Sequence, residues 1–256
     1  GRSTGFKGNP GNGGANNVME GLHYYKCLAD NPYAWGISGR MSVYSGFVRG
    51  GMSGCYFDNV NDLEQTCRHS YLDRAHINNN TLKRPNATKN VLKLHSFQYG
   101  QVALYSEKIM VSGNVLDLRG GISYNGSNDV GDCSIVIGDG GLGDERVRNY
   151  IVENNLTYGC EGQPKGFTAI AAHAPNATVR NNIAYFGLGD GTSSYTATYP
   201  YCHLNMVTVA TGNASNPAGN ARIYNNSLYS NLYNAEVADF VRIFSADVDN
   251  VSIKNN

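Results

Sequence analysis

Hydrophobic and polar residues alternate with a period of two along most of the chain, which is typical of β-strands that bury one face. The alternation is interrupted repeatedly by a pair of polar residues, most often two asparagines, as in "ATVRNNIA" (177–184). No segment of helical length keeps a 3.6-residue period, although "ANNVMEGLHYYKCLAD" (15–30) is compatible with one short helix that caps the core. The pattern predicts an all-β protein.

The polar pair recurs at irregular distances. When the copies are aligned on the second residue of the pair, the aligned asparagines are 34, 41, 27, 44 and 30 residues apart. A constant motif with loops of variable length between its copies is typical of a solenoid, in which each coil is one structural unit. The copies are "AHINNNTL" (75–82), "IMVSGNVL" (109–116), "YIVENNLT" (150–157), "ATVRNNIA" (177–184), "ARIYNNSL" (221–228) and "VSIKNN" (251–256).

A second apolar alternating segment lies between successive copies. Each unit is therefore expected to run as strand, short turn, strand, asparagine turn, short strand and long loop, which predicts a right-handed parallel β-helix. The second segments are "VLKLH" (91–95), "CSIVIG" (133–138), "TAIAAH" (168–173), "NMVTVA" (205–210) and "FVRIF" (240–244).

Asparagine suits the corner of such a coil because it accepts left-handed or bridge backbone conformations. Its amide can also donate to and accept from the amide of the next coil, about 4.8 Å away. Hairpin turns in an antiparallel sandwich are the alternative, but hairpins favour Asn-Gly over Asn-Asn followed by Leu or Ile. The predicted amide ladder comprises Asn80, Asn114, Asn155, Asn182 and Asn226, with Asn256 at its end.

From about residue 66 to 256 the sequence resembles the secreted right-handed parallel β-helix proteins of the pectate-lyase-like superfamily. The resemblance depends on the repeated corners and on the phrases "RAHINNNTL", "NVLKLHSF" and "GDERVRNYIVENN". We expect one β-helix domain over 1–256, with an N-terminal cap and first coils in 1–65 and regular coils in 66–256. "SVYSGFVRGG" (42–51) is compatible with an early coil.

The composition narrows the choice of function. The formal net charge is zero and charged residues make up 16%, which argues against a nucleic-acid binder and gives no reason to expect attachment to an anionic membrane. Six cysteines without a CxxC pair favour up to three disulfides in a secreted protein over six buried thiols. Eight N-x-S/T sites permit glycosylation, and a chain that starts with Gly is expected to have lost an export signal.

The resemblance implies that an extended saccharide binds along the outer face of the strands that precede the first turn. Alternation in "VLKLH" places Lys93 and His95 on that outer face, and His173 is expected on or beside it. Thr208 and Arg242 continue the same file. The remaining candidate binding residues are Arg68, at the upstream end, and Tyr195 and Tyr199. The two tyrosines are candidates for stacking on sugar rings, with ordinary surface tyrosines as the alternative.

The loop "DGGLGDERVR" (139–148) brings further charges to the end of a strand. Asp139, Asp144 and Glu145 are candidate oxygen ligands for calcium, although their spacing is not that of an EF-hand. Surface charge with an internal salt bridge is the equally weighted alternative. Arg146 from this loop is a candidate for pairing with a substrate carboxylate.

These residue types favour a polysaccharide lyase over a glycoside hydrolase. β-Elimination requires a cation for the uronate carboxylate and groups that transfer protons, and Lys93 as base, Arg146 as cation, and His95 with His173 fit that need. A hydrolase requires two carboxylates, and the outward file has none. Lyases of this superfamily are implied to use a Lys–Arg pair with calcium, but no arginine stands one coil after Lys93.

A structural protein is the second hypothesis. An uncapped β-helix exposes strand edges that recruit other chains, and "VSIKNN" (251–256) ends in mid-coil. The chain is then either a fragment or a subunit of a glycosylated, adhesive homo-oligomer assembled end to end. The sequence thus predicts a secreted protein that acts on an acidic polysaccharide, with a non-catalytic fibre as the alternative.

Overall fold

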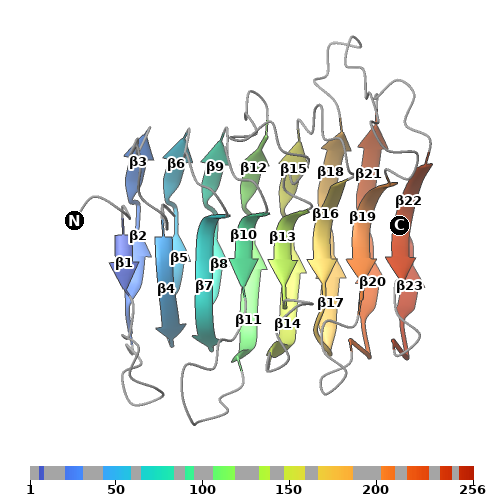
Figure 1. Ribbon diagram of the computed structural model, residues 1–256, viewed down its shortest axis with the longest axis horizontal. Coiled ribbons are helices and arrows are strands. Elements are labelled where there is room, and N and C mark those ends of the chain that lie inside the picture. The colour runs from blue at the N-terminus through green and yellow to red at the C-terminus, as the bar shows by residue number, and fades with distance from the viewer. Residues whose placement is uncertain are drawn as a thin grey trace.

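A computed structural model describes residues 6–8, 21–30, 43–58, 65–83, 90–94, 106–118, 133–138, 147–158, 167–186, 203–210, 218–230, 237–243 and 248–256. These residues form a parallel β-helix whose coils follow one another along a single axis (Figure 1). The strand pairs between neighbouring coils are parallel, for example Leu92 opposite Ile135 and Ile151 opposite Thr178. The predicted fold class is therefore confirmed.

Each complete coil contributes one strand to each of three faces. Face A contains β1 (Phe6–Gly8), β4 (Val43–Val48), β7 (Gln65–Asp73), β10 (Asn90–Leu94), β13 (Cys133–Ile137), β16 (Phe167–Ala172), β19 (His203–Val209) and β22 (Val237–Ile243). Face B contains β2 (His23–Tyr25), β5 (Gly51–Ser53), β8 (His76–Asn78), β11 (Ser106–Ser112), β14 (Val147–Glu153), β17 (Ala177–Arg180), β20 (Arg222–Tyr224) and β23 (Ser252–Lys254).

Face C contains β3 (Leu28–Asp30), β6 (Tyr56–Asp58), β9 (Thr81–Lys83), β12 (Val115–Asp117), β15 (Leu156–Tyr158), β18 (Ile183–Phe186) and β21 (Ser227–Ser230). Faces A and B are joined through the long strand β7 into one 16-stranded sheet, and face C is a separate 7-stranded sheet. The segments identified from the sequence as the second strand of each unit are the strands of face A.

The core fills the inside of the coils because alternate residues of each short strand point inward. On face B the inward file runs through Met52, Ile77, Val111, Val152 and Val179, all fully buried. Like side chains stack on like along the axis, so the period-two pattern of each strand becomes one continuous hydrophobic column.

The two residues of the asparagine pair do different things at the corner between faces B and C. The first residue has a left-handed backbone and is exposed, as at Asn154 (φ 55°) and Asn181 (φ 55°). The second residue, Asn155 or Asn182, is buried. Asparagine adopts the left-handed region at lower cost than most residues, whereas the second position requires its amide.

The buried asparagines form the predicted ladder. The Nδ2 of each donates to the Oδ1 of the next, at 2.9 Å for Asn80 to Asn114, 2.8 Å for Asn114 to Asn155, and 2.9 Å for Asn155 to Asn182. The series continues through Asn226 to Asn256. Each Oδ1 also accepts the backbone N–H of the residue in the preceding coil, so every ladder residue satisfies a buried backbone donor.

The N-terminal coils correct one prediction and confirm another. Residues 23–25 and 28–30 are strands, so the short helix expected over 15–30 is wrong for that half, and residues 15–20 lie outside the described residues. Gly21 (φ 73°) and Lys26 (φ 49°) turn the chain at the two corners and break any helical path. β4 lies within the segment 42–51, which is therefore an early coil.

The expected disulfides are absent among the cysteines that the structure describes. Cys27, Cys55 and Cys67 form no disulfide. Cys27 and Cys55 occupy the ladder position in the first two coils, where the backbone N–H of Cys55 donates to Asn80 Oδ1 at 3.0 Å, and Cys67 packs in the core. The side chains of Cys133, Cys160 and Cys202 lie outside the described residues.

Within the described part of the chain, no helix has the length and apolar character that a membrane crossing requires.

Candidate functional site

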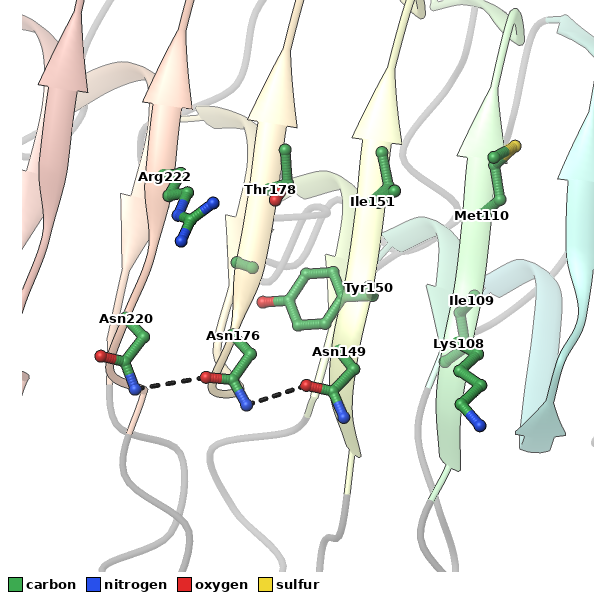
Figure 2. A pocket seen from close by; sticks show the side chains of 11 residues that line it. Lys108, Ile109, Met110, Asn149, Tyr150, Ile151, Asn176, Thr178, Asn220 and Arg222 are labelled. Atoms are coloured by element: carbon green, nitrogen blue, oxygen red, sulfur yellow. Dashed lines mark hydrogen bonds between the residues drawn. The ribbon is translucent and has the colours of Figure 1, made fainter.

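The outer surface of face B carries a hollow of about 690 Å³ (Figure 2). It extends over β11, β14, β17 and β20, and therefore along the axis of the β-helix across four successive coils. Such a shape suits an extended polymer better than a compact ligand. The residues that line it are Lys108, Ile109, Met110, Asn149, Tyr150, Ile151, Asn176, Ala177, Thr178, Asn220 and Arg222.

One edge of the hollow is a second asparagine ladder, at the corner between faces A and B. Asn176 Nδ2 donates to Asn149 Oδ1 at 2.9 Å, and Asn220 Nδ2 donates to Asn176 Oδ1 at 3.2 Å (Figure 2). All three have left-handed backbones, with φ of 54° to 60°, and are exposed. Their amides keep donor and acceptor capacity that is directed at solvent, which is what sugar hydroxyls require.

Sequence reasoning missed this ladder, although a signal was present. Each of Asn149, Asn176, Asn220 and Asn250 stands five residues before the first member of a polar pair. The face B segment between the two corner residues is four residues long, so each corner residue stands at a constant offset of five from the other, and a known corner marks the second one.

The floor of the hollow is an outward file of mixed character. Met110 lies opposite Ile151, Ile151 opposite Thr178, and Thr178 opposite Arg222. Met110 is 37% exposed, so an apolar surface is open to a ligand here. A cation stands at each end, Lys108 and Arg222, separated by three coil steps, or about 14 Å.

The same file continues upstream to a pair of histidines. His76 lies opposite Met110 in the next coil, and Gly51 separates it from His23. Since Gly51 has no side chain, the two imidazole rings meet above it, with centroids 4.8 Å apart. Burial and then the nearby His23 lower the pKa of His76 from 6.5, so its ring is neutral near pH 7.

Beside the downstream end of the hollow, three outward side chains of face B, Glu153, Arg180 and Tyr224, are joined by hydrogen bonds. Arg180 Nε donates to Glu153 Oε2 at 2.6 Å, and its Nη1 donates to the hydroxyl oxygen of Tyr224 at 3.0 Å. These hydrogen bonds raise the pKa of Arg180. Because Arg180 approaches the oxygen of Tyr224, the hydroxyl proton of that tyrosine is directed elsewhere.

Tyr150 lies beneath the hollow and gives a test of the packing there. It is buried, and its hydroxyl donates to Ala174 O at 3.0 Å. Burial raises its pKa well above 10, so the folded protein resists ionisation that the unfolded chain undergoes. We expect Tyr150 to contribute no pH dependence to the free energy of unfolding up to about pH 9, and above about pH 10 to lower it by about 1.4 kcal/mol per pH unit, which urea denaturation of the wild type and of Tyr150→Phe measures as a difference. A Tyr150→Phe variant with the same slope above pH 10 would contradict this assignment.

The residues predicted to form an outward file on face A lie opposite one another in neighbouring strands. Lys93 lies opposite Arg68 on one side and Val136 on the other, and the file continues through Ala171 and Thr208 to Arg242. The file is not an open groove, because Lys93 is 8% exposed, Val136 5%, Ala171 0% and Thr208 6%. The side chain of Arg68 lies outside the described residues.

Most other predicted site residues stay predictions. His173 is half-buried at the corner after β16, and its backbone N–H donates to Ile137 O at 2.8 Å. Among the described residues there is no group of three His, Cys, Asp or Glu side chains that could hold a metal ion, and the calcium prediction is untested. His95, Arg146, Asp139, Asp144, Glu145, Tyr195 and Tyr199 lie outside the described residues.

Comparison with known proteins gives a weak structural likeness. No family model matches the chain. No curated protein matches it. Among solved structures, the chain is similar to an alginate lyase from Paenibacillus sp. str. FPU-7, with a TM-score of 0.40 and 14% sequence identity over 93% of this chain and 82% of that one. A likeness this distant carries no argument about the site.

Proposed function

We propose that the protein is a secreted lyase that binds an acidic, uronate-containing polysaccharide along face B and cleaves it by β-elimination. The observation that supports this best is the lining of the hollow, which combines an amide edge, an apolar floor and a cation at each end. No carboxylate is among the described residues that line it. Carboxylates would be required for glycoside hydrolysis, whereas cations suit an anionic polymer.

The upstream end of the hollow offers the groups that β-elimination requires. Lys108 can offset the charge of a uronate carboxylate and so acidify the adjacent C–H. His76, one coil upstream and neutral near pH 7, can accept that proton. The electron pair of the broken C–H bond then forms the double bond as the glycosidic C–O bond breaks, and the leaving oxygen takes a proton from solvent or from the protonated imidazole.

The test is to incubate the protein with alginate, polygalacturonate and chondroitin and to follow the ultraviolet absorbance of the unsaturated product. A neutral polymer such as dextran is the control. We expect product from at least one uronate polymer and none from dextran. Binding to a uronate polymer without product would contradict the lyase and favour a non-catalytic protein. A parallel series with a calcium chelator tests the calcium prediction separately.

A further inference from the structure

The corner between faces A and B changes character along the axis. In three successive coils it is formed by Arg49, Arg74 and Lys108, with φ of 49°, 48° and 56°. In the following coils the same position is held by asparagines, beginning with Asn149 (φ 54°) and Asn176 (φ 60°). The backbone is therefore the same throughout, and only the side chain differs.

Arginine and lysine are strained at this position. A left-handed backbone brings Cβ against the following carbonyl oxygen, and only glycine, with asparagine and aspartate to a lesser extent, adopts it readily. The later coils show that asparagine satisfies the geometry of the corner. Residues held in such conformations in consecutive coils point to a role for the side chains themselves.

The three basic corner residues are continuous with the hollow. The backbone N–H of Arg49 donates to Asp73 O, and that of Arg74 to Glu107 O, both at 2.9 Å, so the corners stack directly. Lys108, the third, lines the hollow itself. Successive basic corner residues are therefore one coil apart, or about 4.8 Å. They lie on the same corner, between faces A and B, as the exposed ladder of Asn149, Asn176 and Asn220 in the later coils.

In the part of the chain that the structure describes, two carboxylates lie next to these corners. Asp73 forms an ion pair with Arg74 at 2.7 Å, and Glu107 forms one with Arg148 at 2.9 Å. Both pairs are partly exposed and therefore weak. Among the described residues of this stretch, the three basic corner residues and Arg148 outnumber the two acids, so the described part of the ridge carries more cations than carboxylates.

We infer that Arg49 and Arg74 form, with Lys108, an anion-binding ridge that carries the charged units of an acidic polysaccharide from the hollow toward the N-terminal coils. The inference rests on the proposed function and goes further, because it states where the polymer continues upstream of the reacting unit. Long anionic chains reach this ridge, and oligomers short enough to fill the hollow alone do not.

The experiment replaces Arg49 and Arg74 with asparagine, singly and together. Because strain is relieved, the melting temperature is expected to rise by about 2 to 4 °C per substitution. Because two cations are lost, the KM for long uronate polymer is expected to rise about tenfold in the double variant, while its kcat and the KM for a short uronate oligomer stay the same. The rise in KM is also expected to shrink as salt is added.

Lys26→Asn is the matched control. Lys26 has the same backbone (φ 49°) at the other corner, where its ammonium lies over the Tyr25 ring. This variant is expected to gain similar stability with no change in KM. An unchanged KM for long polymer in the double variant overturns the ridge and leaves the lyase intact. If the wild-type protein cleaves nothing, the same variants are compared by direct binding of the polymer, where equal affinities overturn the ridge independently.

Discussion

Replacing Asn155 with alanine is expected to lower the free energy of unfolding by about 3 to 5 kcal/mol. Its Oδ1 accepts the backbone N–H of Asn114 at 3.0 Å and the Nδ2 of Asn114 at 2.8 Å. Its own Nδ2 donates to Val111 O and to Asn182 Oδ1. Alanine leaves a buried backbone donor and a buried carbonyl unsatisfied and opens a cavity, and each defect adds to the cost. Chemical denaturation measures the loss.

The neighbouring Asn154 provides the control for this prediction. It is exposed with a left-handed backbone, so Asn154→Gly is expected to change stability by a few tenths of a kcal/mol. Where Asn155→Ala does not fold, Asn155→Asp is measured instead. Its carboxyl group can donate to Asn182 only when protonated, so this variant is expected to be more stable at pH 4 than at pH 7. Equal stability at both pH values, or an Asn154→Gly as damaging as Asn155→Ala, would contradict a buried amide ladder.

The second large effect concerns cleavage. Replacing His76 with alanine is expected to lower kcat by about 10³-fold on whichever uronate polymer the protein cleaves, because the group that accepts the proton is lost. In the wild-type enzyme kcat/KM is expected to fall as pH drops through the His76 pKa, which lies below 6.5. His23→Ala removes the nearby imidazole that helps to lower this pKa, so it is expected to shift the acid limb of the profile to higher pH.

The Lys93→Ala variant tests whether the reaction takes place at His76 on face B or at Lys93 on face A. If the base is His76, the Lys93 variant keeps its acid limb and most of its kcat once its folding has been verified. Loss of activity in Lys93→Ala together with full activity in His76→Ala would move the reaction to the file of Lys93, Thr208 and Arg242.

The fold followed from the sequence because its repeating feature is local. The pair at 181–182 occurs within one corner, and the strand before it alternates with the period that its burial requires. The sequence did not predict that the two asparagines of the pair have different roles, because a left-handed backbone and a ladder amide both favour asparagine. The expected helix over 15–30 failed because the ladder position there holds Cys27, which hides the corner from a search for asparagines.

The candidate site was harder to predict because it depends on which face of the coil is left open. Alternation predicts that Lys93 faces outward, but the burial of that file at Val136 and Ala171 is a property of the folded chain and not of the pattern. The histidines on face B are 53 residues apart in the sequence and meet only because two coils bring them over Gly51. No short sequence motif predicts the contact between these two histidines.

The ladder has one more consequence, for how such a chain can change in length. Every amide in it points the same way, with its oxygen toward the preceding coil and its nitrogen toward the next. Each ladder asparagine therefore makes the same hydrogen bonds to the coil before it and to the coil after it, whichever coil it belongs to. When one whole coil is duplicated or deleted, the asparagines on either side can form the same hydrogen bonds again. The outer surface of the β-helix can therefore become longer or shorter by whole coils without changes in the core.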